Sequence, residues 1–267
     1  MREQEVRQYR VNTRVYHRRG ICSEYRLDTL AREDAVGLLK YQPAFAGKDV
    51  LDIGVGTGRT AIYLAPLAHR YQAIDYSPVM VREFEQAMPG IPVALADMRD
   101  LSRFGPAEFD FVLASNNVFD AVGHDDRLRA LEEVHRVLRP GGTLMFSAHN
   151  RDVRQLWRGP RLYFSRNPVT QAKLTVHWCL ALANHARLRR LQEVSGDYAI
   201  VNDEAHDCGL LHYYIGPDAQ RRQLRALGFD LLEILDRYGA PVPTGRRAEH
   251  SRWLLYVAQR SPVSWPT

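Results

Sequence analysis

The sequence has little cysteine and no long apolar segment, and each absence excludes a class of protein. Its 267 residues include three cysteines, which lie far apart and form no CxxC pair. We therefore expect neither a disulfide framework nor a zinc site, and a reducing, cytoplasmic setting. The apolar runs are short and strand-like, so no transmembrane helix is expected. The amino-terminal segment is charged throughout and lacks the apolar centre of a signal peptide.

The net charge of +5 is unevenly distributed along the chain. Residues 151–200 contain nine Arg or Lys and three acids, which gives this segment a charge of +6. A basic segment binds nucleic acid, binds an anionic small ligand, or forms a solvated helix face. No RNA-binding signature or interleaved aromatic pattern accompanies it. A solvated face or a small anionic ligand is therefore favoured over nucleic acid.

Strand-like and helix-like segments alternate through the middle of the chain. This alternation predicts an α/β fold, with a parallel sheet covered by helices on both faces. The expected strands are 48–55, 71–77, 91–98, 109–118 and 142–150, and the helices between them are 58–68, 78–88 and 125–138.

The alternation stops after Asn150 and returns at Pro217. We interpret residues 1–45 as an amino-terminal helical cap and residues 46–150 as the core. Residues 151–216 are expected to form an inserted lid with a helix near 169–192, and residues 217–262 to complete the core with a helix and two strands.

Three glycines, Gly54, Gly56 and Gly58, follow a strand that ends near Asp52. Their spacing differs from the G-x-G-x-x-G of a dinucleotide site, and Arg59 stands where a P-loop carries lysine. The two phosphate-binding interpretations are thereby weakened. What remains is a tight turn that lets a bulky cofactor lie across the strand ends.

Acids recur at the next two strand ends. A carboxylate at Asp75 suits the two hydroxyls of a ribose, and Asp97 followed by Met98 suits the amine and ring of an adenine. Each acid alone is more often a cap or turn residue than a ligand. Three acids at three consecutive strand ends favour a cofactor site.

Five segments in this order resemble the motifs of class I S-adenosylmethionine-dependent methyltransferases: VLDIGVGTGR, AIDYS, ALADMRDL, FDFVLASNNV and VLRPGGTLMFS. The resemblance covers roughly residues 48–150. It implies a Rossmann-like sheet of seven mostly parallel strands with an antiparallel last strand. It also implies S-adenosyl-L-methionine as cofactor and S-adenosylhomocysteine as product.

The resemblance further implies roles for individual residues around that cofactor. The glycines would pass beneath its methionine part, Asp52 would lie near its amino group, directly or through water, and Asn116 would approach the same part. Asp75 would bind the ribose, and Asp97 the adenine amine, with Tyr76 and Met98 flanking the ring. A tyrosine and an arginine of the cap would close over the site, the candidates being Tyr16, Tyr25 and Arg26.

The acceptor of the methyl group is expected above the ends of the fourth and fifth strands. Methyl transfer needs alignment and exclusion of water, and a hydroxyl or ammonium acceptor also needs a base. His149 is the first choice of base, with Asp120 and His124 next. The alternative, that His149 only forms a hydrogen bond to a loop or to the substrate, is nearly as well supported. Further candidates for substrate contacts are Asn117, Asn150, His212 and Tyr214, the last two of which are at least as well explained as lid packing.

These observations lead us to expect an enzyme that methylates O or N of a small molecule or natural-product intermediate, with methylation of carbon left open. The alternatives are an RNA or protein methyltransferase that uses the basic segment 151–190, and a non-catalytic binding protein. We expect a small-molecule partner, anionic if the basic segment contributes to its binding, no metal ion, no membrane contact, and a monomer or homodimer.

Overall fold

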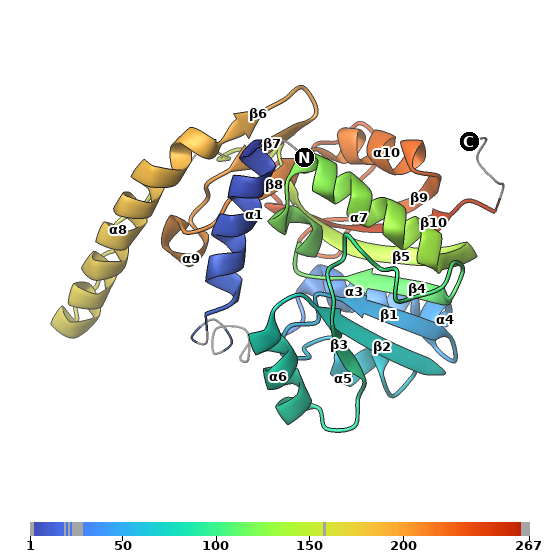
Figure 1. Cartoon of the computed structure of the whole chain (residues 1–267). Helices are drawn as coiled ribbons and strands as arrows, with labels where there is room; N and C mark the ends of the chain where they lie inside the picture. Colours follow the sequence, from blue (N-terminus) through green and yellow to red (C-terminus); the bar gives the residue numbers. More distant parts are fainter. Residues whose placement is uncertain (1–2, 19, 21, 23–28, 157–158, 263–267) are drawn as a thin grey trace.

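A mixed sheet of ten strands runs through the described residues, which are 3–18, 20, 22, 29–156 and 159–262 of a computed structural model (Figure 1). Seven of its strands form the predicted core. Their spatial order is β3 (Val93–Leu95), β2 (Arg70–Asp75), β1 (Asp49–Ile53), β4 (Phe109–Ala114), β5 (Leu138–Asn150), β10 (Trp253–Arg260) and β9 (Phe229–Leu235). The last strand, β10, is antiparallel to both neighbours. The predicted Rossmann-like sheet with an antiparallel last strand is therefore confirmed.

Helices cover both faces of this sheet, as the alternating pattern predicts. Buried residues of α7 (His124–Val137) and α10 (Pro217–Ala226) join one apolar cluster. The other cluster contains buried residues of α3 (Arg32–Lys40), α4 (Gln42–Phe45), α5 (Ala61–Leu64) and α6 (Pro78–Ala87). Parallel strands buried on both faces place all their carboxyl ends at one edge, where the site residues are expected.

The insertion adds three strands that the sequence analysis did not predict. They are β6 (Glu193–Val194), β7 (Tyr198–Val201) and β8 (His212–Ile215). Strand β8 pairs in parallel with the last two residues of β5, His149 opposite Tyr214 and Asn150 opposite Ile215. The sheet thus continues past the end of β4, and β8 brings its side chains beside the carboxyl end of β5.

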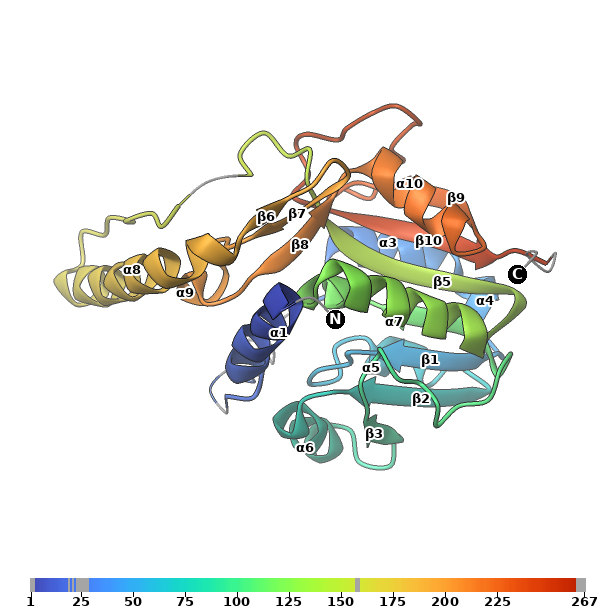
Figure 2. The same cartoon turned by 45° about the horizontal axis from the view of Figure 1, so that its top comes forward.

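The predicted helix near 169–192 is present as α8 (Pro168–Leu188), followed by the short η2 (Arg189–Leu191) and, after β7, by α9 (Ala205–Cys208). Helix α8 extends away from the sheet (Figures 1 and 2), and only Ala181 and Leu188 of its residues are buried. Among the described residues, no helix combines the length and apolarity that crossing a bilayer requires.

The amino-terminal helix α1 (Glu3–Tyr16) is held over the sheet edge by two side-chain amides. Gln8 Nε2 donates to the carbonyls of Val122 and Leu211, each at 3.1 Å. Asn12 Nδ2 donates to the carbonyls of Ala121 and Leu211 at 2.7 and 2.8 Å, and its Oδ1 accepts from Leu211 N. The cap therefore joins the segment after β4, which includes η1 (Val118–Ala121), to the start of β8.

Candidate active site

The glycine turn after β1 lies against a pocket at the carboxyl edge of the sheet. Gly54 and Gly56 have φ values of +68° and +57°, which residues other than glycine rarely adopt. A Cβ at Gly54 would lie 2.5 Å from Val118 Cγ2, whereas a Cβ at Gly56 would meet nothing within 4 Å. Gly54 is thus required by packing, whereas Gly56, which lines the pocket, has open space where a Cβ would stand.

The two acids at the next strand ends also line this pocket. Asp75 accepts backbone N–H groups from Gly56 at 2.9 Å and Ser77 at 2.8 Å, which fixes its carboxylate beside the turn. Burial raises its pKa to about 6 despite these donors. Burial would also raise the pKa of Asp97, but hydrogen bonds and charge from Arg99 lower it overall.

Most of the predicted cofactor residues line this first pocket. They are Tyr16, Gly54, Gly56, Asp75, Tyr76, Asp97, Met98 and Asn116. Asp52 does not line it: its carboxylate lies behind the turn and accepts from Thr60 Oγ1 at 2.5 Å and Tyr71 Oη at 2.8 Å. Gly58 packs against Met88 and Phe84 instead. Tyr25 and Arg26 lie outside the described residues.

Two polar residues that line this pocket, Arg59 and Tyr9, were not among the predicted cofactor residues. Arg59, taken only as the wrong residue for a P-loop, lines the pocket and donates to Ser115 Oγ at 3.1 Å. Tyr9 lines it from α1 and donates to Asp97 Oδ2 at 3.4 Å. The position of Arg59 inside the glycine motif was the available signal for one of them, whereas no local pattern marks Tyr9.

A second pocket adjoins the first and shares Tyr16, Asn116 and Asn117 with it. The two asparagines follow β4 and both have positive φ values, 57° and 59°. Ser147 Oγ accepts from the backbone N of Asn117 at 2.8 Å, which ties this bend to β5. The remaining lining of the second pocket is Ala31, Glu33, Asp34, Ser147, His149, Asp203, Glu204, Ala205, His206, His212, Arg252 and Trp253.

His149 lines the second pocket and is oriented by a buried carboxylate. Its Nδ1 lies 2.8 Å from Asp120 Oδ2, which also accepts from the backbone N of His149. The other oxygen of Asp120 pairs with Arg127, and both of these side chains are fully buried. Because an ionised carboxylate accepts but does not donate, we assign the Nδ1 proton to His149, and its Nε2 is then an acceptor near Asn117.

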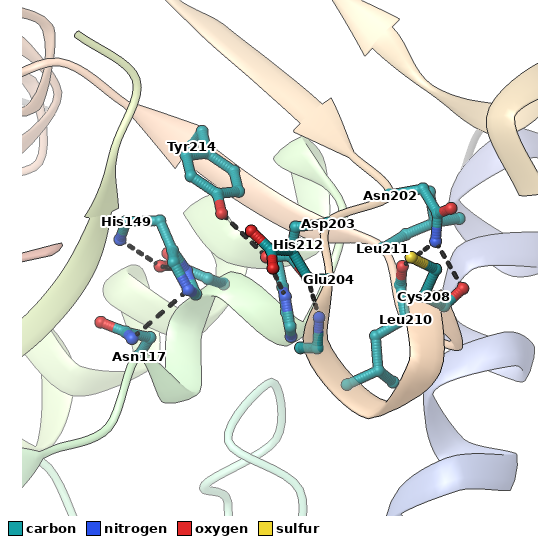
Figure 3. Close-up of polar contacts among 12 residues, drawn as sticks. Asn117, His149, Asn202, Asp203, Glu204, Cys208, Leu210, Leu211, His212 and Tyr214 are labelled. Atoms are coloured by element: carbon teal, nitrogen blue, oxygen red, sulfur yellow. Dashed lines mark hydrogen bonds and ion pairs between the residues drawn. The ribbon is translucent and has the colours of Figure 1, made fainter. Parts of the chain in front are cut away.

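A second histidine–aspartate pair lies beside the first (Figure 3). His212 Nδ1 is 2.9 Å from Asp203 Oδ2, and the rings of His212 and His149 stack with centroids 4.9 Å apart. Tyr214 Oη donates to the same oxygen of Asp203 at 2.8 Å. Burial alone would lower the pKa of His212, but the Asp203 carboxylate raises it overall. Asp203 was not predicted from the sequence, because no motif surrounds it.

Four other predicted residues do not line either pocket. Asp120 lies behind His149, so it orients the histidine and does not face the acceptor space. His124 stacks on Tyr198 at 4.2 Å and bonds Tyr213 Oη at 2.8 Å. Asn150 is fully buried, and its side-chain amide donates to the carbonyls of Arg247, Ala248 and Ser251. These hydrogen bonds anchor the loop before β10. His124 and Asn150 therefore contact other parts of the protein and not either pocket. Tyr214 does not line a pocket itself, but it donates to Asp203 and packs against the ring of His149, which both do.

His149, Asp203 and His212 also meet the geometry of a metal-binding cluster, with one ligand atom each within 4.8 Å of the others. Sequence analysis predicted no metal ion. In the structure, Asp203 Oδ2 already receives His212 and Tyr214, and Arg252 Nη2 lies 3.6 Å away. The charge of this carboxylate is thus balanced by groups of the protein itself.

Comparison with known proteins agrees with this geometry. A family model described as a methyltransferase domain matches residues 50–142. A "Probable S-adenosylmethionine-dependent methyltransferase" of Mycolicibacterium smegmatis is 32% identical over 107 residues, which are 40% of this chain and 40% of that protein. The malonyl-[acyl-carrier protein] O-methyltransferase of Enterobacter lignolyticus is 32% identical over 134 residues, 48% of this chain and 51% of that protein. This chain spans about half or less of the length of these curated relatives.

Solved structures share the fold over most of the chain. An S-adenosylmethionine-dependent methyltransferase of Clostridium acetobutylicum has a TM-score of 0.60 at 15% identity, over 89% of this chain and 94% of that one. The 1,6-didemethyltoxoflavin-N1-methyltransferase of Burkholderia thailandensis, solved with its substrate and S-adenosylhomocysteine, has a TM-score of 0.54 at 18% identity. That match covers 88% of this chain and 80% of the other.

Residues 50–142 belong to a methyltransferase domain, and most of the chain has the fold of S-adenosylmethionine-dependent methyltransferases. The predicted family and cofactor are therefore confirmed. The first pocket fits S-adenosylmethionine on two structural grounds. The Gly56 backbone leaves open space beside the Asp75 carboxylate, and Asp97 and Met98 lie on the same pocket wall.

Proposed function

We propose that the chain is a methyltransferase that transfers a methyl group to O or N of a small molecule bound in the second pocket. S-adenosylmethionine supplies the methyl group as a carbon electrophile and leaves as S-adenosylhomocysteine. The observation that carries the proposal is the junction of the two pockets at Tyr16, Asn116 and Asn117, with His149 on the acceptor side. A small acceptor at this junction lies within reach of both the cofactor and a base.

Residues of this chain have distinct roles in the proposed reaction. Asp75, Asp97 and Met98 hold the nucleoside part, and Arg59 beside Ser115 suits the carboxylate of the methionine part. His149 Nε2 takes the proton of the acceptor, while Asp120 fixes its tautomer and stabilises the imidazolium that forms. Helix α1 and strand β8 exclude water from the junction, since they are joined through Leu211.

The alternative of an RNA or protein methyltransferase has less support in the site. None of the described residues among 151–190 lines either pocket. Helix α8, whose Lys and Arg residues are Lys173 and Arg187, extends away from the sheet, so these charges lie outside both pockets. An RNA affinity that falls steeply with salt would favour this alternative.

The proposal is tested by incubating the protein with a metabolite library and S-adenosylmethionine that carries a deuterated methyl group. Mass spectrometry then searches for a product heavier by one labelled methyl, with Asp75→Ala as the control protein. The expected result is a labelled small molecule with the native protein alone. Binding of S-adenosylhomocysteine by calorimetry without any labelled product from the library would count against a small-molecule acceptor.

A further inference from the structure

The second pocket contains more carboxylates than cationic side chains. Glu33, Asp34, Asp203 and Glu204 line it, and Arg252 is the single Arg or Lys among its described lining residues. A pocket with low-dielectric walls and one sign of charge concentrates ligands of the opposite sign. The four carboxylates differ in how far neighbouring groups neutralise them.

Two of the four are balanced by neighbouring groups. Asp203 receives His212 and Tyr214 and lies 3.6 Å from Arg252. Burial alone would raise the pKa of Asp203, but the charge of His212 and its hydrogen bond lower it far below the usual range. Glu204 is more exposed, accepts from Tyr163 Oη at 3.1 Å and lies 3.8 Å from Arg252.

Glu33 and Asp34 are not balanced to the same extent. They stand side by side in the first turn of α3 and are only 2% and 3% exposed. Glu33 accepts from the uncharged indole N–H of Trp253, and Asp34 Oδ2 lies 3.3 Å from Arg59 Nη2. Asp34 Oδ1 is buried and has no hydrogen-bond partner among the described residues. The charges of Arg59 and Arg237 both act on Glu33, but among the described residues Arg59 is the one guanidinium within ion-pair distance of either acid.

Such an arrangement costs free energy when nothing is bound, because a buried charge needs a partner. The amino-terminal position in α3 stabilises both acids through the helix dipole. Desolvation nevertheless raises the pKa of Glu33, and raises that of Asp34 to about 6. A cation that enters the second pocket would supply the missing partner.

We propose that the acceptor is a small molecule with a basic amine, whose ammonium group binds between Glu33 and Asp34. The inference rests on the proposed function, since it names the class of substrate for that site. The aromatic rings of Tyr16 and Trp253 line the same pocket and offer faces that attract an organic cation. An anionic ligand, the alternative that the basic segment would favour, meets carboxylates of its own sign in this pocket.

An ammonium fits this position better than a metal ion. The metal-like cluster of His149, Asp203 and His212 does not include Glu33 or Asp34. In that cluster Asp203 is already neutralised, and the Nδ1 of each histidine faces a carboxylate. The uncompensated charge thus lies at α3, where no imidazole or thiol of the described residues completes a ligand set.

The test compares three matched probes: benzylamine, benzyl alcohol and benzoate. Each is titrated up to tens of millimolar into the chelator-treated protein saturated with S-adenosylhomocysteine, and binding is followed by NMR. We expect benzylamine to bind at least about tenfold more tightly than either other probe, equivalent to about 1.4 kcal/mol. Equal or tighter binding of benzoate, or no binding of any probe, would overturn the proposal.

Variants locate the binding of benzylamine within the pocket. Glu33→Gln keeps the oxygen that accepts from Trp253 and removes the charge, so it is expected to abolish the preference and leave affinity for S-adenosylhomocysteine unchanged. Asp34→Asn is expected to weaken benzylamine as well. Glu249→Gln, a partly exposed acid that pairs with Arg154 outside both pockets, is the matched control and should change nothing.

Further outcomes separate this inference from its alternatives. If Glu33→Gln and Asp34→Asn lose S-adenosylhomocysteine rather than benzylamine, the missing cation is the amino group of the cofactor, and the inference fails. If Zn²⁺ binds with micromolar affinity and displaces benzylamine, the cation is a metal ion, and the inference fails. A labelled product without a basic nitrogen would overturn the substrate class yet confirm methyl transfer, whereas an amine preference without any transfer would overturn the proposed function alone.

Discussion

The two pockets of this chain are assembled in different ways. The first pocket, proposed for the cofactor, is built largely from residues 53–60, 74–80, 96–98 and 115–122, each at or directly after the end of a core strand. The second pocket, proposed for the acceptor, combines the first turn of α3, the end of β5, the loop after β7, strand β8 and the start of β10. The first is therefore encoded by short local motifs, and the second by contacts between segments far apart in the sequence.

Substitution of His149 should give the largest effect and should separate the two pockets functionally. We expect His149→Gln to lower kcat by about 10²- to 10⁴-fold, because a positioned base contributes that much to proton transfer. The affinity for S-adenosylhomocysteine should stay unchanged, since His149 does not line the cofactor pocket. Rates are measured on the acceptor found by the labelled screen.

Asp120→Asn provides the matched test of the orienting carboxylate. It should also lower kcat, through the wrong tautomer or orientation of His149. His250→Gln, which alters an exposed histidine outside both pockets, is the control. Full activity of His149→Gln would remove the base from the mechanism and leave alignment as the main source of catalysis.

Asp75→Ala should affect the opposite half of the site. Removing a carboxylate that accepts the ribose hydroxyls is expected to weaken S-adenosylhomocysteine about 100-fold, or about 3 kcal/mol. Calorimetry measures the change, and thermal unfolding checks that the glycine turn remains folded without its acceptor. Asp100→Ala, an exposed acid near the same edge, should bind normally. Equal binding by both variants would contradict the cofactor role of Asp75.

The difference in construction explains how far the sequence could be interpreted. Strand alternation and the glycine and acid motifs predicted the core sheet and most of the cofactor pocket, because a parallel sheet places consecutive strand ends together. Asp52 also ends a strand, yet it is not in the pocket lining, because its carboxylate accepts from Thr60 and Tyr71 behind the turn. Residues at a strand end share an edge, but the sequence does not say which side chain faces the pocket.

The acceptor side was predicted less completely for a physical reason. Asp203, Glu33 and Arg252 enter the pocket only because β8 pairs with β5 and α3 packs on β10. None of these residues belongs to a local motif. The basic segment, by contrast, was conspicuous in the sequence, yet none of its described residues among 151–190 lines either pocket.

Asn150→Ala should sharpen the distinction between pocket residues and anchors. The two N–H groups of its side-chain amide are shared among three carbonyls of the loop before β10, so we expect a loss of about 2 kcal/mol in the free energy of unfolding. Affinity for S-adenosylhomocysteine should be unchanged. Chemical denaturation measures the loss, with the exposed Asn167→Ala, a cap of the projecting helix, as a comparison. A stable variant that lost only acceptor binding would restore the substrate role predicted from the sequence.

The smallest expected effect concerns the pH dependence of stability at Asp34. Its folded-state pKa is raised from 3.8 to about 6 by burial, so the folded protein holds this proton more tightly than the unfolded chain. The resulting stabilisation is complete below about pH 4 and is lost as the pH rises through about 6. Asp34→Asn removes this dependence, so the free energy of unfolding of the variant relative to the native protein should increase by about 1 kcal/mol between pH 5 and pH 8. Urea denaturation of the ligand-free proteins at both pH values measures it, with Glu249→Gln as control. A difference that stays constant with pH would mean that Arg59 already neutralises Asp34, and the case for a missing cation at α3 would then rest on Glu33 alone.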